Sequence, residues 1–221
     1  MKRKIITTGD GSKTIQIEDW DEQYHSKHGA VQEAYHVFIG HGLRLFQNRK
    51  VHLLEIGFGT GLNALITLHE AVGQNLQIDY VGVEAFPVSM EEVNQLDYCE
   101  QLGFEGLEQM FQKMHSCPWG EVISITTDFS LLKQKKDFKQ IDQQDLFNLI
   151  YFDAFGARVQ PELWTEEIFL KMYQALAIDG VLVTYAAKGS VRRAMQAVGF
   201  TVERWPGPPG KREMLRAIKT S

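Results

Sequence analysis

Residues 51–71 read VHLLEIGFGTGLNALITLHEA, and this stretch decides the fold. It begins with an apolar run, passes Gly57, Gly59 and Gly61, and continues with good helix formers. Glycines at a strand-to-helix turn permit tight backbone geometry and close approach of a ligand. The N–H groups at the start of the helix then favour an anionic group. The stretch therefore predicts a strand over 51–56, a ligand-binding turn and a helix over 61–72.

The spacing of the glycines separates two kinds of nucleotide site. A dinucleotide fingerprint, G-x-G-x-x-G, would need glycine at position 62, which is Leu62. An NAD-dependent oxidoreductase is therefore disfavoured, although NAD binding without S-adenosylmethionine (SAM) binding would revive it. The observed E-x-G-x-G-x-G resembles the SAM loop, and this resemblance implies that Glu55 lies near the amino group of the methionine moiety. The predicted cofactor contacts in this stretch are Glu55, Gly57, Phe58, Gly59, Thr60, Gly61 and Asn63.

The pattern after position 50 alternates strands with helices. Strands are predicted at 51–56, 78–84, 121–127, 147–152 and 180–186, and helices at 61–72, 89–100, 105–115 and 164–176. Such alternation predicts a doubly wound parallel sheet. A further helix, SVRRAMQAVG, precedes two runs, FTVERW and REMLRAIKT, which a short Gly/Pro loop joins as an antiparallel pair. That ending is the class I SAM-dependent methyltransferase pattern, an α/β fold.

The segment before this core is predicted to be a small appendage. A hairpin around Gly9-Asp10-Gly11 is followed by a helix ending near Gly40. We expect an N-terminal extension over 1–46, packed on a Rossmann-like methyltransferase domain over 47–221. The polar stretch 132–145 is interpreted as a solvated connection.

Composition restricts the class of protein. The 221 residues carry a net charge of −5 and suit one domain. No apolar run approaches the ~18 residues that a membrane span needs, and no signal peptide is recognisable, so we expect a cytoplasmic protein that binds no membrane. The two cysteines, Cys99 and Cys117, are interpreted as buried thiols, and no metal site is expected. Residues 185–221 hold eight Lys/Arg against two Glu, so a modest total charge hides a basic tail.

Three acids follow successive predicted strands. Glu84 ends the second strand, and a carboxylate there can accept both ribose hydroxyls of a nucleotide. Asp128 follows the predicted third strand, where such enzymes contact the adenine edge. Asp153 follows the fourth strand, LIYF. Each acid alone could be a helix or turn cap. Together they mark the carboxyl edge of the sheet, where open α/β sheets bind ligands.

Asp153 is the predicted catalytic residue. Methyl transfer needs a free lone pair on the acceptor, so an amine acceptor must first lose a proton. Asp153 could accept that proton, or it could hydrogen-bond the amine so that its lone pair points at the methyl group. The sequence leaves both roles open.

Four stretches together carry a resemblance to one family: EIGFGTGLNALIT, VEAFP, FDAFGARVQPELWTEEIF and GSVRRAMQAVGFTVERWPGPPGKREML. They resemble the bacterial tRNA 5-methylaminomethyl-2-thiouridine methyltransferases, often fused to a flavin-dependent oxidase. The resemblance implies SAM as cofactor, tRNA as partner with no obligatory protein partner, and N-methylation of 5-aminomethyl-(2-thio)uridine at the wobble position. Asp153 matches the acidic residue that lies at the acceptor amine in this family. The residues implied in substrate or tRNA binding are Glu33, Phe155, Lys188, Arg192, Arg193, Lys211 and Arg212.

The chain also departs from the family. The run Asp153-Ala154-Phe155-Gly156-Ala157 replaces the Asp-Gly-Phe sequence of many members, so the loop around the substrate departs from the family pattern while the carboxylate is kept. The chain ends at Ser221, so we expect no oxidase domain and no FAD. Phe155 is predicted to stack on a flipped base, whereas Trp164 is expected in the core.

Two other functions remain open on sequence. A polyamine-type aminopropyltransferase shares the fold and an acid near an amine, but its polycationic substrate fits poorly with the basic tail. A non-catalytic SAM-binding, RNA-associated module would keep SAM binding and show no dependence on Asp153.

Overall fold

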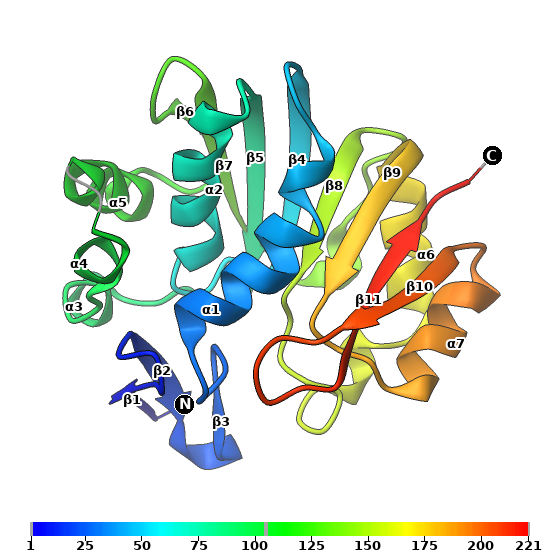
Figure 1. Ribbon diagram of the computed structural model, residues 1–221, viewed down its shortest axis with the longest axis horizontal. Helices are drawn as coiled ribbons and strands as arrows, with labels where there is room; N and C mark the ends of the chain where they lie inside the picture. Colours follow the sequence, from blue (N-terminus) through cyan, green and yellow to red (C-terminus); the bar gives the residue numbers. More distant parts are fainter. Residues whose placement is uncertain (1, 104–105, 221) are drawn as a thin grey trace.

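The computed structural model describes residues 2–103 and 106–220, which form two sheets (Figure 1). The large sheet has eight strands in the order β10-β11-β9-β8-β4-β5-β7-β6. Its parallel strands are β4 (Lys50–Ile56), β5 (Gln77–Glu84), β7 (Phe129–Lys135), β8 (Phe147–Phe152) and β9 (Leu176–Thr184). The antiparallel strands are β11 (Glu213–Ile218) and β10 (Thr201–Pro206) at one edge and β6 (Val122–Ser124) at the other. This is the class I methyltransferase arrangement that the sequence predicts.

Helices cover both faces of the large sheet (Figure 1). Neighbouring residues of a strand face opposite sides, so Leu53 of β4 packs in one core cluster and Leu54 in the other. Both are at most 1% exposed, as expected of parallel strands covered on both sides. The first face carries α1 (Ala30–Ala34), α2 (Leu62–Gly73) and α5 (Leu107–Ser116), and the second carries α6 (Glu166–Ala175) and α7 (Gly189–Ala197).

The helix expected to end near Gly40 is confirmed, because α1 continues as a wide π-helical turn over Tyr35–Gly40. The single helix expected over 89–100 is wrong. Two short helices, α3 (Met90–Val93) and α4 (Tyr98–Leu102), occupy this region. The Asp97 side chain between them accepts a hydrogen bond from the Lys13 backbone N–H at 2.9 Å, a contact outside the helix that no local periodicity reveals.

The third parallel strand lies later than predicted. The expected strand over 121–127 is wrong: only the short edge strand β6 forms there, and the parallel strand is β7. The interpretation of 132–145 as a solvated connection fails for its first residues, because Lys133 is 1% exposed within β7. Its ammonium donates to the His115 carbonyl at 2.7 Å and lies 4.9 Å from the centre of the Trp119 ring. From the sequence alone, a lysine that is buried with such partners cannot be told apart from a lysine in a solvated loop.

The small sheet consists of β1 (Arg3–Thr7), β2 (Lys13–Ile17) and β3 (Glu22–Gln23), and it lies at the carboxyl edge of the parallel strands (Figure 1). The predicted hairpin is confirmed by the β1–β2 pairing. Two arginines tie this sheet to the core. Arg3 donates to the Phe86 carbonyl at 2.6 Å, and Arg158 donates to Glu22 at 2.9 Å and the Trp20 carbonyl at 3.2 Å. Among the residues placed here, no helix is long and apolar enough to cross a bilayer.

Candidate active site

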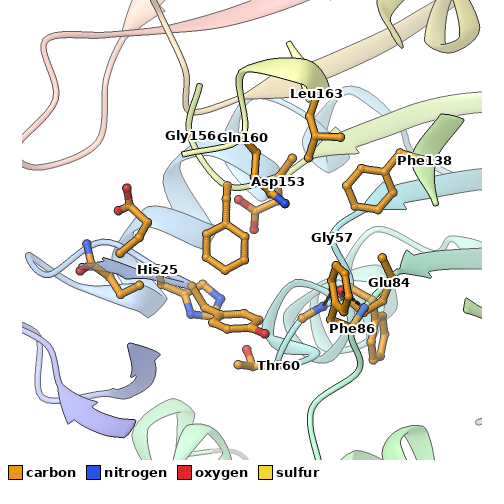
Figure 2. A pocket seen from close by; sticks show the side chains of 18 of the residues that line it. His25, Gly57, Thr60, Glu84, Phe86, Phe138, Asp153, Gly156, Gln160 and Leu163 are labelled. Carbon is orange, nitrogen blue, oxygen red and sulfur yellow. Dashed lines mark hydrogen bonds between the residues drawn. The ribbon is translucent and has the colours of Figure 1, made fainter. Parts of the chain in front are cut away.

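A cavity of about 370 Å³ lies at the carboxyl edge of the parallel strands, beneath the small sheet. The glycine loop, the ends of β5 and β8, and the segment 20–25 form its walls (Figure 2). A volume of this size suits a small organic ligand. Residues on its walls include Trp20, Glu22, Tyr24, His25, Gly57, Thr60, Asn63, Glu84, Phe86, Asp137, Phe138, Asp153, Phe155, Gln160 and Tyr185.

The glycine loop has the backbone geometry that its sequence predicts. Gly57, Gly59 and Gly61 all have positive φ, at 91°, 50° and 73°. A Cβ at Gly57 would stand 2.6 Å from the Asp153 carbonyl, so only glycine lets β4 and β8 end this close together. Glu84, at the end of β5, accepts hydrogen bonds from the Gly59 N–H at 3.0 Å and the Phe86 N–H at 2.9 Å. The loop therefore has a fixed shape.

Asp153 lies on the cavity wall directly after β8 (Figure 2). Its backbone N–H donates to the Ile56 carbonyl at 2.9 Å, which fixes it beside the end of β4. The side chain accepts a hydrogen bond from Asn63 Nδ2 at 2.8 Å. Burial, together with the negative charge of Glu33, raises the pKa of Asp153 to about 7, although Asn63 and Lys211 oppose this shift. A carboxyl group with such a pKa can exchange a proton near neutrality.

Glu55 is 1% exposed and lies beneath the cavity rather than on its wall. Its two oxygens accept hydrogen bonds from Tyr80 at 2.7 Å and Asn63 at 2.9 Å. Burial raises its pKa well above the ordinary range. Asn63 thus uses one amide nitrogen for two carboxyl groups, while its own oxygen Oδ1 is buried without a partner. Because Asn63 lines the cavity, this unpaired acceptor lies near any ligand bound there.

The predicted position of Asp128 at the carboxyl edge is wrong. Because the parallel strand is β7, Asp128 precedes it, and its carbonyl accepts from the Ile78 N–H at the amino end of β5. It lines a hollow with Asn48 and Arg49 at the opposite edge of the sheet. The acid that follows β7 is Asp137, which lines the cavity.

The cations of the basic tail differ in exposure and in their partners. Lys211 Nζ contacts both oxygens of Glu33, at 2.8 and 3.0 Å, so these two predicted substrate residues bind each other. Lys188 and Arg212 are exposed and line a second hollow of about 600 Å³, which shares Gly156 and Tyr185 with the cavity. Arg193 is exposed on α7, whereas Arg192 has its Nε buried without a partner.

Aromatic residues surround the cavity. Phe155, predicted to stack on a base, makes edge-to-face contacts with Trp20 at 5.6 Å and Tyr24 at 5.0 Å between ring centres. Trp164 is 5% exposed and packs in the core as expected. Sequence reasoning did not identify the segment 20–25 as part of the site. The signal was the charged and aromatic run DWDEQYH, which has no apolar periodicity of its own.

The family model that describes an S-adenosyl-L-methionine-dependent methyltransferase matches residues 107–220, just over half of the chain. The chain belongs to this methyltransferase family. The match covers β7, β8 and the C-terminal hairpin, so it includes Asp153 but not the glycine loop.

Curated relatives are bacterial proteins named tRNA 5-methylaminomethyl-2-thiouridine biosynthesis bifunctional protein MnmC. The methyltransferase is 30% identical to the one from Azoarcus sp. over 213 residues, covering 89% of this chain and 33% of the relative. It is 28% identical to the one from Hydrogenovibrio crunogenus over 212 residues, covering 88% and 31%. The chain thus spans about a third of the length of these relatives.

Two solved structures support the fold. MNMC2 from Aquifex aeolicus aligns with a TM-score of 0.80 at 24% identity, over all of this chain and 71% of that one. Spermidine synthase from Thermotoga maritima aligns with a TM-score of 0.54 at 15% identity, over 97% and 72%. The methyltransferase fold is therefore shared with a protein named for a different group transfer.

The residues of this methyltransferase fit the cofactor that its family name implies. Gly57 and Gly59 of the positive-φ loop line the cavity with backbone atoms alone, Glu84 lies on its wall at the end of β5, and Asn63 has an amide oxygen with no hydrogen-bond partner. Among the residues with described positions, no three His, Cys, Asp or Glu side chains are placed to hold a metal ion.

Proposed function

We propose that the protein methylates the primary amine of 5-aminomethyl-(2-thio)uridine at the tRNA wobble position, with SAM as donor. The observation that carries the proposal is Asp153: a half-buried carboxyl group with a pKa of about 7 on the wall of the cavity. The names of the curated relatives supply the nucleoside and the tRNA.

The chemistry follows from the groups on the wall. When bound, SAM supplies an electrophilic methyl group on a sulfonium. The amine lone pair of the substrate would take this methyl group, and the nitrogen would lose one proton overall. Asp153 accepts this proton or holds the amine by a hydrogen bond, while the Asn63 amide fixes the carboxylate at 2.8 Å.

Exclusion of water supports the same reaction. Trp20 and Tyr24 of the N-terminal segment pack edge to face on Phe155, two residues after Asp153. A flipped base needs an aromatic face and a dry pocket. Phe155 could supply that face, and the N-terminal segment forms part of the cavity wall.

We propose that the RNA backbone binds in the second hollow. Its lining residues Lys188 and Arg212 are exposed, and Gly156 and Tyr185 join it to the cavity. A strand that delivers one base to Asp153 would place its neighbouring phosphates there.

The decisive experiment uses purified protein, SAM and tRNA from a strain that accumulates 5-aminomethyl-2-thiouridine. Nucleoside mass spectrometry should show a gain of one methyl group on that nucleoside. Asp153→Asn should bind SAM almost normally and lose methyl transfer at least ~100-fold. Asp128→Asn, the same substitution at the opposite edge of the sheet, should behave as wild type. Unchanged turnover in Asp153→Asn would remove that residue from the mechanism and favour a binding module.

One observation favours a second candidate, a polyamine-type aminopropyltransferase. The cavity wall carries more carboxylates than the strand ends alone predict, namely Glu22, Glu84, Asp137, Asp153 and Glu162. Such acids could hold a polycation. Incubation with putrescine and decarboxylated SAM tests this candidate directly, and formation of spermidine without tRNA methylation would replace the first proposal.

A further inference from the structure

The Glu33–Lys211 ion pair joins two segments that are far apart in sequence, beside Asp153. Lys211 lies in the loop between β10 and β11, and Glu33 lies on α1. The Lys211 ammonium contacts both Glu33 oxygens, at 2.8 and 3.0 Å, and stands 3.8 Å from the centre of the Tyr185 ring. The side chains are 9% exposed for Glu33 and 31% for Lys211. The ammonium is therefore held by a carboxylate and an aromatic face.

This pair interacts electrostatically with Asp153. After burial, the Glu33 charge is the largest influence on the Asp153 carboxyl, and the Lys211 charge acts in the opposite direction. Tyr185 connects the groups further, because its hydroxyl donates to the carbonyl of Ala154, the next residue after Asp153, at 2.8 Å. The polar groups that face or interact with Asp153 are Glu33 on α1, Glu55 on β4, Asn63 on α2, Tyr80 on β5, Tyr185 after β9 and Lys211.

The loop that carries Lys211 has little freedom to move. A Cβ at Gly210 would overlap the His28 ring, so the loop lies directly on the N-terminal segment. The His36 ring forms a hydrogen bond with the Pro206 carbonyl at 2.8 Å at the start of the loop. These contacts hold the backbone of the loop in place. A movement of the Lys211 ammonium from one carboxylate to another would therefore require rotation of its side chain.

We infer that Glu33 is a positioning residue: it holds the Lys211 ammonium away from Asp153 and thereby keeps that carboxylate available to the acceptor amine. The catalytic role of this positioning rests on the proposed function, whereas the Glu33–Lys211 ion pair is independent of it. The Lys211 ammonium binds the Glu33 carboxylate and also interacts electrostatically with the Asp153 carboxylate. If it moved to Asp153, it would occupy the group that must meet the substrate ammonium and would repel that substrate.

Two variants distinguish this role from simple structural support, because they should shift the titration of Asp153 in opposite directions. Glu33→Gln removes a negative charge and frees Lys211 to approach Asp153, so the pKa of Asp153 should fall by about one unit. Lys211→Met removes the positive charge, so the pKa should rise by about one unit. The measurement is carbon-13 NMR of cofactor-free protein labelled at the Asp carboxyls, with Asp153 assigned by Asp153→Asn.

Glu213→Gln is the matched control, because Glu213 pairs with Arg204 at 3.6 Å on the same hairpin and should leave Asp153 unchanged. The shift of the Asp153 pKa in either variant alone tests the inference, so the inference remains testable if one variant does not fold. No shift, or a shift of both variants in the same direction, would overturn it.

The inference and the proposed function can fail separately. Opposite pKa shifts in the two variants, together with no methylation of the tRNA by the wild-type protein, would support the positioning role and reject the proposed substrate. In an active enzyme, the acid limb of the pH–rate profile should move with the NMR titration in both variants.

Discussion

At the scale of single residues, the site depends on one amide shared by two carboxyl groups. Asn63 donates to both Glu55 and Asp153, yet only Asp153 reaches the cavity. Both carboxyl groups have raised pKa values because both are withdrawn from water. Burial thus separates a structural acid, enclosed by Tyr80 and Asn63, from an acid that can exchange protons with a substrate.

The raised pKa of Asp153 predicts a pH-dependent stability. Its pKa changes from an ordinary 3.8 to about 7, so between these values the folded protein binds a proton that the unfolded chain has lost. Stability is therefore lost as pH rises through this window. Asp153→Asn removes the effect, so its free energy of unfolding relative to wild type should increase by roughly 2–3 kcal/mol between pH 5 and pH 8. Urea unfolding at the two pH values measures this, and an equal difference at both would contradict the raised pKa.

The same group predicts the pH dependence of the reaction. If the ionised Asp153 carboxylate serves the amine, the rate at saturating substrate should rise with pH up to about 7 and then level off. Single-turnover methylation from pH 5.5 to 8.5 tests this expectation. A rate that is flat over this range would mean that Asp153 does not change its charge during catalysis.

A glycine substitution tests the loop geometry. Gly57→Ala would place its Cβ 2.6 Å from the Asp153 carbonyl at a φ of 91°, so we expect it to cost roughly 2 kcal/mol or more and to weaken SAM binding. Gly73→Ala is the control, because nothing lies within 4 Å of its Cβ position near the end of α2. It should be neutral or stabilising. Thermal unfolding and calorimetric SAM titration compare the two variants.

At the scale of elements, the N-terminal segment completes the cavity. The parallel strands place Glu84 and Asp153 at one edge, but the walls opposite them come from residues 20–25. That segment contains the last residue of a 3-10 helix (Glu18–Trp20) and the two-residue strand β3. Arg158 fixes it by hydrogen bonds to Trp20, Asp21 and Glu22. An element with so little secondary structure of its own depends on such contacts for its position.

Loss of that contact should act on binding rather than on chemistry. Arg158→Ala should loosen the segment, speed SAM dissociation and raise the KM for SAM several-fold, while the rate at saturation changes little. Arg44→Ala is a matched control, because Arg44 is equally exposed and pairs with Glu70 at 3.6 Å away from the cavity. Stopped-flow measurement of SAM dissociation checks the prediction. Equal rates for wild type and Arg158→Ala would show that the segment closes without Arg158.

At the scale of the whole molecule, charge is distributed unevenly around the sheet. The net charge is −5, yet the exposed Lys188 and Arg212 line a hollow that shares residues with the cavity, while acids line the cavity itself. Such an arrangement suits a polyanion that delivers a cationic group. The phosphates would meet the basic surface, and the amine would meet the carboxylates.

This arrangement predicts a salt-dependent affinity for tRNA. Lys188→Ala/Arg212→Ala should weaken binding and reduce the slope of log K against log salt by about 2. Arg44→Ala/Arg49→Ala removes the same charge elsewhere and should leave the slope unchanged, since Arg49 lines the hollow at the opposite edge of the sheet. Filter binding across a salt series compares them. Equal slopes for both double variants would place the RNA on another surface.

The predictions from sequence succeeded where the signal was local. The stretch at 51–71 encodes its strand, turn and helix in adjacent residues, and the structure confirms all three. The predictions failed where the surroundings of a side chain came from residues distant in the sequence. Lys133 reads as solvated, but the His115 carbonyl and the Trp119 ring make its burial possible, so β7 was misplaced and Asp128 was put at the wrong edge.

Alternation of strands and helices, the glycine spacing and the acids after β5 and β8 were enough to define a class I methyltransferase with a carboxylate at its ligand edge. Those features depend on backbone geometry and periodicity, which neighbouring residues specify. The pairing of Glu33 with Lys211, the enclosure by residues 20–25 and the pKa of Asp153 came from the folded molecule alone. The reason is that burial and Coulomb interactions depend on distances between residues far apart in the chain, which folding sets.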